Sequence, residues 1–390
     1  MRWWILLLLF LARIGQGFQF QTLGSVGDNL VQDFGLGYAE IGTLIGLFML
    51  PGLFLALPAG YSGRFFSDRL LAGLGLGALA LGGLVSGYAT DSWMIGVGRI
   101  LSGAGFLFST LYFTKMTAEW FAGKEIATAM SILVMSWPFG IAMGQVGHEW
   151  LAETIHWRWP FFVASAYCAV GSLAVLALYR PPGTASSSGN APPTMGLNRQ
   201  EWYLILFAGL AWGIFNVGYV IYLTFAPLVL EAQGQTAITA AAIISVGSWI
   251  MIFSGAACGQ IVDRTGKPNI VLTVCMFAAI AAMLLLAVEG RGLAASLLIG
   301  LIGIAPAGVI MALSGEAMRP DRRAFGMGVF FTIYYAVMAA GPPLAGWIYD
   351  STGEPFAPIL FGVLMFAAVI PANFLFRAVQ KRKPVAAVSA

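Results

Sequence analysis

Residues 269–288 read NIVLTVCMFAAIAAMLLLAV, an apolar run of twenty residues without a charged side chain. At 1.5 Å per residue, a helix of about 20 residues crosses the roughly 30 Å hydrocarbon core of a bilayer. Of the 390 residues, 59% are apolar and only 9% are charged, and the net charge is +3. A soluble domain typically carries about 25% charged residues. The composition therefore predicts a membrane protein and excludes a soluble enzyme and a nucleic-acid-binding protein.

Twelve apolar segments of this kind, counting the quoted one, follow one another along the chain. Because lipid offers the main chain no hydrogen-bond partner, we expect each segment to be a helix. They lie at roughly 4–29, 38–62, 69–90, 93–117, 126–150, 158–179, 202–230, 238–262, 269–288, 292–317, 325–349 and 356–377. The predicted fold class is an all-α membrane protein with twelve transmembrane helices.

The positions of lysine and arginine predict the orientation of these helices. With a cytoplasmic N-terminus, sixteen of the twenty Lys and Arg residues fall in or beside cytoplasmic segments, and the exceptions are Arg13, Arg99, Arg158 and Arg291. The positive-inside rule then places both termini in the cytoplasm. We expect a multi-pass protein of the cytoplasmic, or inner, cell membrane.

The chain divides into two halves that resemble each other. The stretch from Pro181 to Asn198 is rich in Pro, Ser and Gly, so we assign residues 1–180 and 201–390 to two six-helix bundles and 181–200 to a cytoplasmic linker. At an offset of 199 residues Ala12 pairs with Ala211, and Gly60 with Gly259. An internal repeat of helical bundles is typical of transporters. Chance similarity among apolar residues is the alternative.

The loop before the quoted run carries a recognisable motif. Gly259-Gln260-Ile261-Val262-Asp263-Arg264-Thr265-Gly266-Lys267 resembles the signature loop of the major facilitator superfamily, G-x-x-x-D-R-x-G-K/R. The resemblance implies two pseudo-symmetric six-helix bundles and a cytoplasmic gate. It also implies that Asp263 caps the N-terminus of a neighbouring helix, where the helix dipole favours a carboxylate.

The corresponding segment of the first half departs from the motif. In Gly60-Tyr61-Ser62-Gly63-Arg64-Phe65-Phe66-Ser67-Asp68-Arg69, an arginine stands where the acid is expected, and the carboxylate follows four residues later. We extend the gating role to Asp68 and Arg69.

Arg99-Ile100-Leu101-Ser102-Gly103-Ala104-Gly105 is similar to another pattern of the superfamily, R-x-x-x-G-x-G. This resemblance implies that Arg99 bonds between helices or takes part in coupling, so a structural role and a substrate-binding role both stay open. Fainter strings, Leu50-Pro51-Gly52 and Ser136-Trp137-Pro138-Phe139-Gly140, resemble the branch associated with cyanate, nitrate or nitroimidazole.

Arg13 is the most informative residue of the first segment. If the helix enters the membrane near Trp3, Arg13 lies about 15 Å deep, near the midplane, where a guanidinium costs about 2.5–3.5 kcal/mol unless it faces a cavity or a partner. Gln16 and Phe20 continue its helix face. The repeat maps this stripe onto Trp212, Asn216 and Tyr219. We predict that these six residues line a central substrate site; the alternative is that Arg13 snorkels or only packs.

The acidic residues point to the charge of the substrate. Acidic residues such as Asp28 and Asp263 lie at predicted helix ends or in loops, and none of this group is predicted near the midplane. An exporter of cationic drugs usually needs a buried carboxylate. A buried arginine instead favours an anionic substrate, which can accept two hydrogen bonds from the planar guanidinium group.

Other residue types add no chemistry. Cys168, Cys258 and Cys275 lie inside apolar runs and are expected to pack as small hydrophobic side chains, so we predict no cofactor and no metal. His148 and His156 flank the outer end of a predicted helix and are expected to be solvated loop residues.

The sequence therefore predicts a transporter, not an enzyme, that moves a small anion or polar acid by rocker-switch alternating access. We expect the protein to be a monomer in the bilayer. Coupling of transport to a proton is a hypothesis to be tested. An exporter of hydrophobic or aromatic compounds, in which Arg13 is structural, is the first alternative. A non-transporting membrane sensor and an intramembrane enzyme are weaker alternatives, since no zinc pair or nucleophile motif is present.

Overall fold

The computed structural model describes residues 1–63, 65–121, 125–182, 196–319 and 322–381. No β-strand occurs in these ranges, and twelve helical segments are long and apolar enough to cross a membrane. The helices of the first half are α1 (Arg2–Ser25), α2 (Gly27–Phe34), α3 (Tyr38–Ser62), α4 (Asp68–Gly87), α5 (Ser92–Trp120), α6 (Ile126–Thr154) and α7 (Trp159–Leu178). Those of the second are α8 (Arg199–Ala232), α9 (Ala237–Thr265), α10 (Pro268–Leu285), α11 (Gly292–Leu298), α12 (Ala307–Glu316), α13 (Arg323–Thr352) and α14 (Ala357–Gln380). The expected all-α membrane fold is confirmed.

Two of the expected segments are not continuous α-helices. The first is interrupted at Val26, where α1 ends and the short helix α2 begins. The tenth contains α11, a π-helical turn over Ile299–Gly303, and α12. Pro306, which has no main-chain N–H to continue a helix, precedes α12. Main-chain groups freed by the π turn find side-chain partners, since Ser254 donates to the carbonyl oxygen of Gly300 at 2.6 Å.

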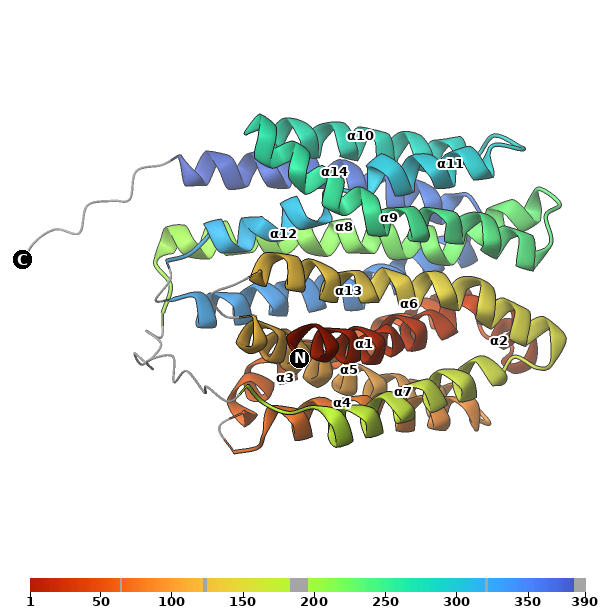
Figure 1. Ribbon diagram of the computed structural model, residues 1–390. Helices are drawn as coiled ribbons and strands as arrows, with labels where there is room; N and C mark the ends of the chain where they lie inside the picture. Colours follow the sequence, from red (N-terminus) through yellow and green to blue (C-terminus); the bar gives the residue numbers. More distant parts are fainter. Residues whose placement is uncertain (64, 122–124, 183–195, 320–321, 382–390) are drawn as a thin grey trace, which may run out of the picture.

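The repeat read from the sequence extends over all twelve spans. The offset of 199 residues carries the start of each spanning helix in the first half to within two residues of a helix start in the second. Tyr38 and Ala237 begin α3 and α9, and Ser92 and Gly292 begin α5 and α11. The helices of the two halves occupy opposite sides of the bundle, and α13 lies between them beside the first half (Figure 1).

The bundle has two ends, which we name by their connections. The linker face is the end where α1 and α8 begin and α14 ends, and the distal face is the end where α2 lies and α3 begins. Residues 183–195 of the expected linker lie outside the described residues. Towards the distal face α3 and α13 approach each other closely, since a Cβ atom on Gly46 would lie 2.5 Å from the carbonyl oxygen of Ala339. Glycine is required there because the two main chains nearly touch.

Candidate functional site

Arg13 lies in the middle of α1 and is 8% exposed. Its Nη1 donates to the carbonyl oxygen of Leu133 at 2.5 Å and to Ser136 Oγ at 3.3 Å, both on α6. Its Nε is buried without a partner. Among the described residues, Nη2 donates no hydrogen bond and no carboxylate pairs with the guanidinium. One edge of the planar group, Nε with Nη2, is therefore left without a protein partner.

Gln16 and Phe20 follow Arg13 along α1. Gln16 is fully buried, donates from Nε2 to Ser109 Oγ at 2.7 Å and accepts at Oε1 from Thr110 at 3.1 Å. Both ends of its amide are therefore held by α5. Phe20 packs against the rings of Phe48 and Trp137, each with its centroid 5.3 Å away. The stripe predicted from the sequence thus combines a guanidinium edge without a described hydrogen-bond partner, a fixed amide and neighbouring aromatic rings.

Arg99 on α5 has a different environment from Arg13. It is completely buried, and its Nε, Nη1 and Nη2 donate to the main-chain oxygens of Leu44, Gln19 and Phe20 at 3.2–3.4 Å. The guanidinium carbon lies 4.5 Å from the centroid of the Phe48 ring, a cation–π contact. All three nitrogens are used in joining α5 to α1 and α3, which favours the structural role; substrate binding by Arg99 stays a prediction.

The three residues expected from the second half all lie on α8. Asn216 is half-buried and donates from Nδ2 to the carbonyl oxygen of Trp212 at 2.7 Å. The hydroxyl of Tyr219 lies 3.2 Å from Ser248 Oγ. The ring of Trp212 stacks on that of Phe215 at 5.9 Å. Within the described ranges no hydrogen bond joins these side chains to Arg13, so their shared site stays a prediction.

The predicted gating motif lies at the linker face, in the turn from α9 to α10. Gly266, with φ of 64°, ends α9 in the left-handed conformation that glycine adopts readily. Asp263, Arg264 and Lys267 are exposed, and Gly259 is half-buried. The carboxylate of Asp263 forms no hydrogen bond or ion pair with any residue that the structure describes. Its expected capping contact is therefore not made in this conformation.

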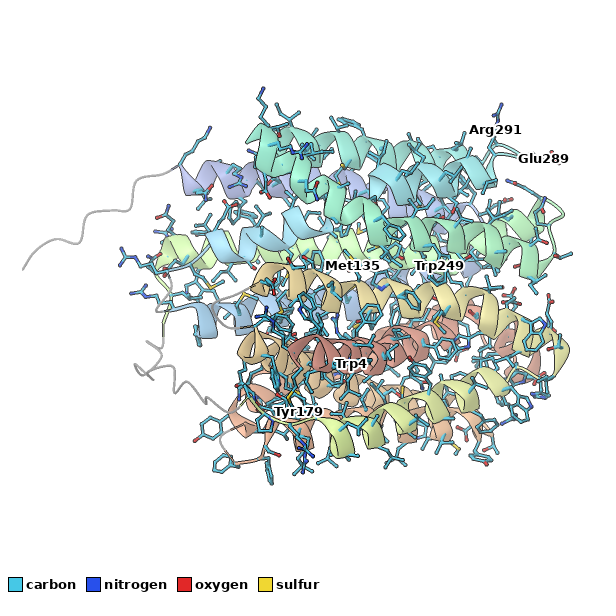
Figure 2. All side chains as sticks on the ribbon, in the orientation of Figure 1. Trp4, Met135, Tyr179, Trp249, Glu289 and Arg291 are labelled. Carbon is cyan, nitrogen blue, oxygen red and sulfur yellow. The ribbon has the colours of Figure 1, made fainter. Side chains whose placement is uncertain are left out.

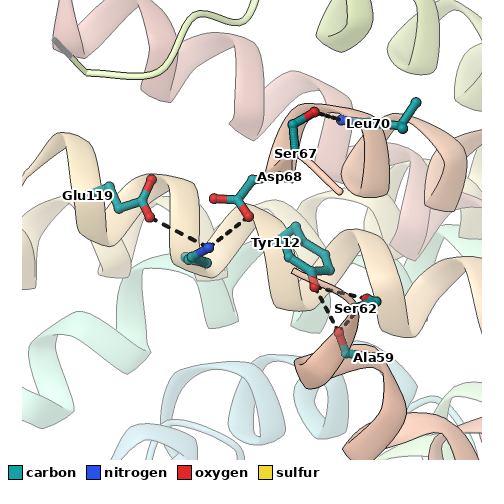
Figure 3. Close-up of polar contacts among 8 residues, drawn as sticks. Ala59, Ser62, Ser67, Asp68, Leu70, Tyr112 and Glu119 are labelled. Carbon is teal, nitrogen blue, oxygen red and sulfur yellow. Dashed lines mark hydrogen bonds and ion pairs between the residues drawn. The ribbon is translucent and has the colours of Figure 1, made fainter. Parts of the chain in front are cut away.

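In the first half the corresponding acid is engaged within its own bundle. Asp68, in the first turn of α4, accepts a hydrogen bond from Lys115 Nζ of α5 at 2.8 Å, and Ser67 caps the same helix through the N–H of Leu70 (Figure 3). Arg69 is exposed. Arg64, which stands at the acid position of the motif, lies outside the described residues. The gating role of Asp68 and Arg69 stays a prediction.

At the distal face an acid caps a helix of the opposite half. The carboxylate of Asp350, near the end of α13, accepts hydrogen bonds from the main-chain N–H groups of Tyr38 at 2.8 Å and Ala39 at 2.7 Å, in the first turn of α3. These are the only hydrogen bonds between side chain and main chain that join the halves among the described residues. Sequence reasoning missed Asp350, because the residues that it caps lie 312 and 311 positions away in the sequence.

The expectation for His148 is wrong. The helix α6 ends at Thr154, so His148 lies more than one turn before its end, and the side chain is fully buried. Its Nε2 lies 2.9 Å from the carbonyl oxygen of Phe18, and its ring packs on that of Phe18. His156, by contrast, is exposed, as expected for a loop residue. The cysteines Cys168, Cys258 and Cys275 are buried and free.

The comparison with protein families decides the assignment. The model of the Major Facilitator Superfamily matches residues 5–336. The chain belongs to this superfamily. It is therefore a membrane transporter, and not an enzyme, as the sequence predicted. The comparisons do not support the expected resemblance to the cyanate, nitrate and nitroimidazole branch.

Several superfamily relatives are distant and match only in part. The chain is 28% identical over 180 residues to the probable sphingolipid transporter spinster homolog 1 of Arabidopsis thaliana, covering 44% of this chain and 35% of the relative. It is 25% identical to the gallate transporter of Pseudomonas putida, covering 40% and 35%. The alignments thus span about a third of the length of these curated relatives.

Solved structures match over almost the whole chain. A bacterial homologue of the human lysosomal transporter Spinster, in an inward-facing and unoccupied conformation, superposes with a TM-score of 0.71 at 17% identity, over 97% of this chain and 96% of the other. The nucleoside transporter NupG gives 0.73 at 15% identity, over 95% and 99%. These superpositions show that the chain shares the fold of both structures. At 15–17% identity they show the fold alone, so the substrate has to be argued from the site.

Proposed function

We propose that this protein is a secondary transporter of a small anion or polar acid, and that Arg13 receives the negative charge of the substrate. It works by rocker-switch alternating access in the cytoplasmic membrane, with both termini in the cytoplasm, as the positive-inside rule predicts. Residues 1–180 and 201–390 are the two moving bundles. Because one chain carries both halves of the site, a monomer suffices, and the proton is the coupled ion we expect.

The unpaired edge of Arg13 carries this proposal. A buried guanidinium normally satisfies its N–H groups and pairs with an anion, because an uncompensated charge is costly in a medium of low dielectric constant. Here Nη1 is fixed by Leu133 and Ser136 while Nε and Nη2 are without described partners. Two parallel N–H groups on one edge match the two oxygens of a carboxylate. The fixed Nη1 would hold the fork in the orientation that binding needs.

The neighbouring aromatic rings favour a carboxylate with an apolar or aromatic body. Trp137 follows Ser136 directly, and its ring lies 4.9 Å from that of Phe106 and 5.3 Å from that of Phe20. One relative is named a gallate transporter, and gallate is an aromatic acid. Such an acid would combine an oxyanion for Arg13 with a ring that packs against these aromatic rings.

The conformation fits one stage of the transport cycle. The halves are joined by Asp350 at the distal face, whereas Asp263 at the linker face has no described partner. If the linker face is cytoplasmic, the two halves are held together on the external side, and the Asp263 contact on the cytoplasmic side is not made. This agrees with the similarity of the chain to a transporter structure described as inward-facing.

Binding of gallate, benzoate and the neutral benzamide to purified protein tests the proposal, with affinity and thermal stability both measured. We expect the two acids to bind and benzamide not to bind. Arg13→Gln removes the charge and should abolish acid binding without loss of folding. Arg13→Lys keeps the charge and loses the fork, so it should weaken binding about tenfold. Arg291→Gln, on the exposed turn between α10 and α11 (Figure 2), is the matched control.

One observation favours the alternative exporter of aromatic compounds. The rings of Phe139 on α6 and Trp249 on α9 lie 4.9 Å apart and join the two halves by an aromatic contact, and Phe10 packs on Phe139. A path of aromatic rings can bind neutral ligands. Benzamide and benzoate binding equally well to the wild type and to folded Arg13→Gln protein would establish the exporter and reject the role of Arg13.

A further inference from the structure

A cavity of about 240 Å³ lies between the two halves at the distal face. The first half contributes α1, α2, α3 and α6 to its wall, and the second contributes α8 and α9. Four carboxyl groups line it, those of Asp28, Glu149, Glu153 and Glu231, and its described lining contains no Lys, Arg or His. The ionisable side chains of the cavity are therefore acidic, whereas the one at the Arg13 site is basic.

The four carboxyl groups interact across the boundary between the halves. Glu149 on α6 interacts electrostatically with Asp28, Glu153 and Glu231, and Glu231 belongs to α8 of the second half. When two of these carboxyl groups are ionised, their like charges repel each other. Burial raises the pKa of Asp28 above its usual range, and the hydrogen bond that Tyr38 donates to it acts in the opposite direction. The cavity thus brings four acidic side chains together without a basic side chain among its described lining residues.

A buried amide also faces the cavity without a partner. Gln145, one turn before Glu149 on α6, lines the cavity and is only 2% exposed. Neither its Nε2 nor its Oε1 has a hydrogen-bond partner among the described residues. A buried amide that bonds neither to protein nor to ligand is unfavourable. A ligand that offers both a donor and an acceptor would satisfy it.

We propose that this cavity binds an organic cation, a small molecule with an ammonium or guanidinium group and a partly polar body. The carboxyl groups would surround the charge, Gln145 would bind the polar part, and Ile41, Pro227 and Leu228 would contact the apolar part. A bare metal ion fits less well, because no three acidic, His or Cys side chains among the described residues lie close enough to hold one.

The position of the site gives the bound cation a mechanical effect. It lies between Glu149 of one half and Glu231 of the other, so a cation there attracts both halves and offsets their repulsion. Tyr38 lines the same cavity and is held at its main chain by Asp350. Occupation of the cavity therefore stabilises the conformation with a closed distal face.

Binding of 2-(4-hydroxyphenyl)ethylammonium, whose phenol hydroxyl offers Gln145 a donor and an acceptor, to the purified full-length protein tests this site. The matched probes are neutral 2-(4-hydroxyphenyl)ethanol, anionic 4-hydroxyphenylacetate and sodium chloride at equal ionic strength. We expect the ammonium to bind and stabilise the protein, and Glu149→Gln to weaken its affinity about tenfold or more through loss of a charge-assisted hydrogen bond. Glu289→Gln, an exposed acid on the turn between α10 and α11 (Figure 2), should bind like the wild type.

A second variant separates ligand binding from folding. Gln145→Met removes an amide that has no hydrogen-bond partner in the described part of the chain, so the free protein should be as stable as the wild type or more stable, while ammonium affinity falls. If the ammonium binds elsewhere, Gln145→Met will leave its affinity unchanged, and that result would overturn the proposal. Equal stabilisation by sodium chloride, or by 2-(4-hydroxyphenyl)ethanol, would overturn it as well.

Arg13→Gln distinguishes this proposal from the proposed function. Retained ammonium binding in that variant supports a separate distal site, whether or not anion binding is lost. Loss of ammonium binding in well-folded Arg13→Gln protein would place the ammonium at the Arg13 site and overturn the distal assignment.

Discussion

Asp350 of the second half accepts a hydrogen bond from the main-chain nitrogen of Tyr38 of the first half at 2.8 Å. Its other oxygen accepts from the next residue, Ala39, at 2.7 Å. The first N–H groups of a helix have no partner within the helix, and its positive end attracts a carboxylate. One side chain therefore caps a helix and also joins the two halves, a contact that must break whenever the distal face opens.

Asp350→Ala should raise the population with an open distal face. Loss of a capping side chain costs about 1 kcal/mol, which corresponds to about a fivefold change in the ratio of the two states. Spin labels at Tyr88 and Gln235, exposed positions on opposite halves, would report the distal distance. Glu354→Gln, an exposed acid near Asp350, is the control and should leave the distances unchanged. Equal distance distributions in wild type and Asp350→Ala would contradict the role of this contact.

Asp263→Asn should have the opposite effect. Asp263 has no described partner here, so its substitution should not destabilise this conformation. Its capping contact is expected only when the linker face is closed, and losing it should lower the population with an open distal face. The same pair of labels measures the change. An unaltered population would remove Asp263 from the gating mechanism.

Substitution of the two membrane arginines should separate structure from function. Arg99→Gln leaves three main-chain oxygens without their charged donor and should lower the free energy of unfolding by about 2–3 kcal/mol. Arg13→Gln removes a guanidinium of which only Nη1 has partners among the described residues, and should leave stability nearly unchanged. Reversible unfolding in denaturant measures both. A larger loss for Arg13→Gln than for Arg99→Gln would show that the roles are reversed.

Gly46→Ala should hinder closure of the distal face. Its methyl group would lie 2.5 Å from the carbonyl oxygen of Ala339, so α3 and α13 would have to separate. Gly147→Ala is the matched control, because it is also in a helix and its methyl group would meet no atom within 4 Å. The control should be neutral or stabilising, since alanine is favoured over glycine in a helix by about 1 kcal/mol. Transport assays and label distances should change only for Gly46→Ala.

The sequence predicts the number and order of the spans well, because bilayer thickness and the cost of unpaired main-chain groups leave few choices. It does not predict the interruptions at Val26 and at the π turn Ile299–Gly303. Glycine and proline are common in membrane helices, where neighbouring helices satisfy the freed main-chain groups, so these residues do not mark a break in advance. His148 was misplaced because an amphipathic residue near a helix end fits either a loop or an extra turn.

The candidate site shows the same division. The cost of a guanidinium in lipid predicts that Arg13 turns into the protein, and its side chain is indeed buried. Its partners were not predictable, because Leu133 and Ser136 are 120 and 123 residues away in sequence and meet it only through packing of α6 on α1. The contact of Asp350 with Tyr38 spans 312 residues and joins separate bundles, so no local pattern encodes it.

In the proposed transport cycle, the glycine contacts between α3 and α13 would lower the cost of ordering side chains. Gly42 and Gly46 present main chain to Pro342 and Ala339, so at these two positions the helices meet without long side chains that must adopt one rotamer. Ordering a long side chain costs up to about 2 kcal/mol in entropy, and glycine has none to order. At these two positions the helices could therefore part and meet again with little side-chain entropy lost, as a surface that separates in the proposed alternating-access cycle requires.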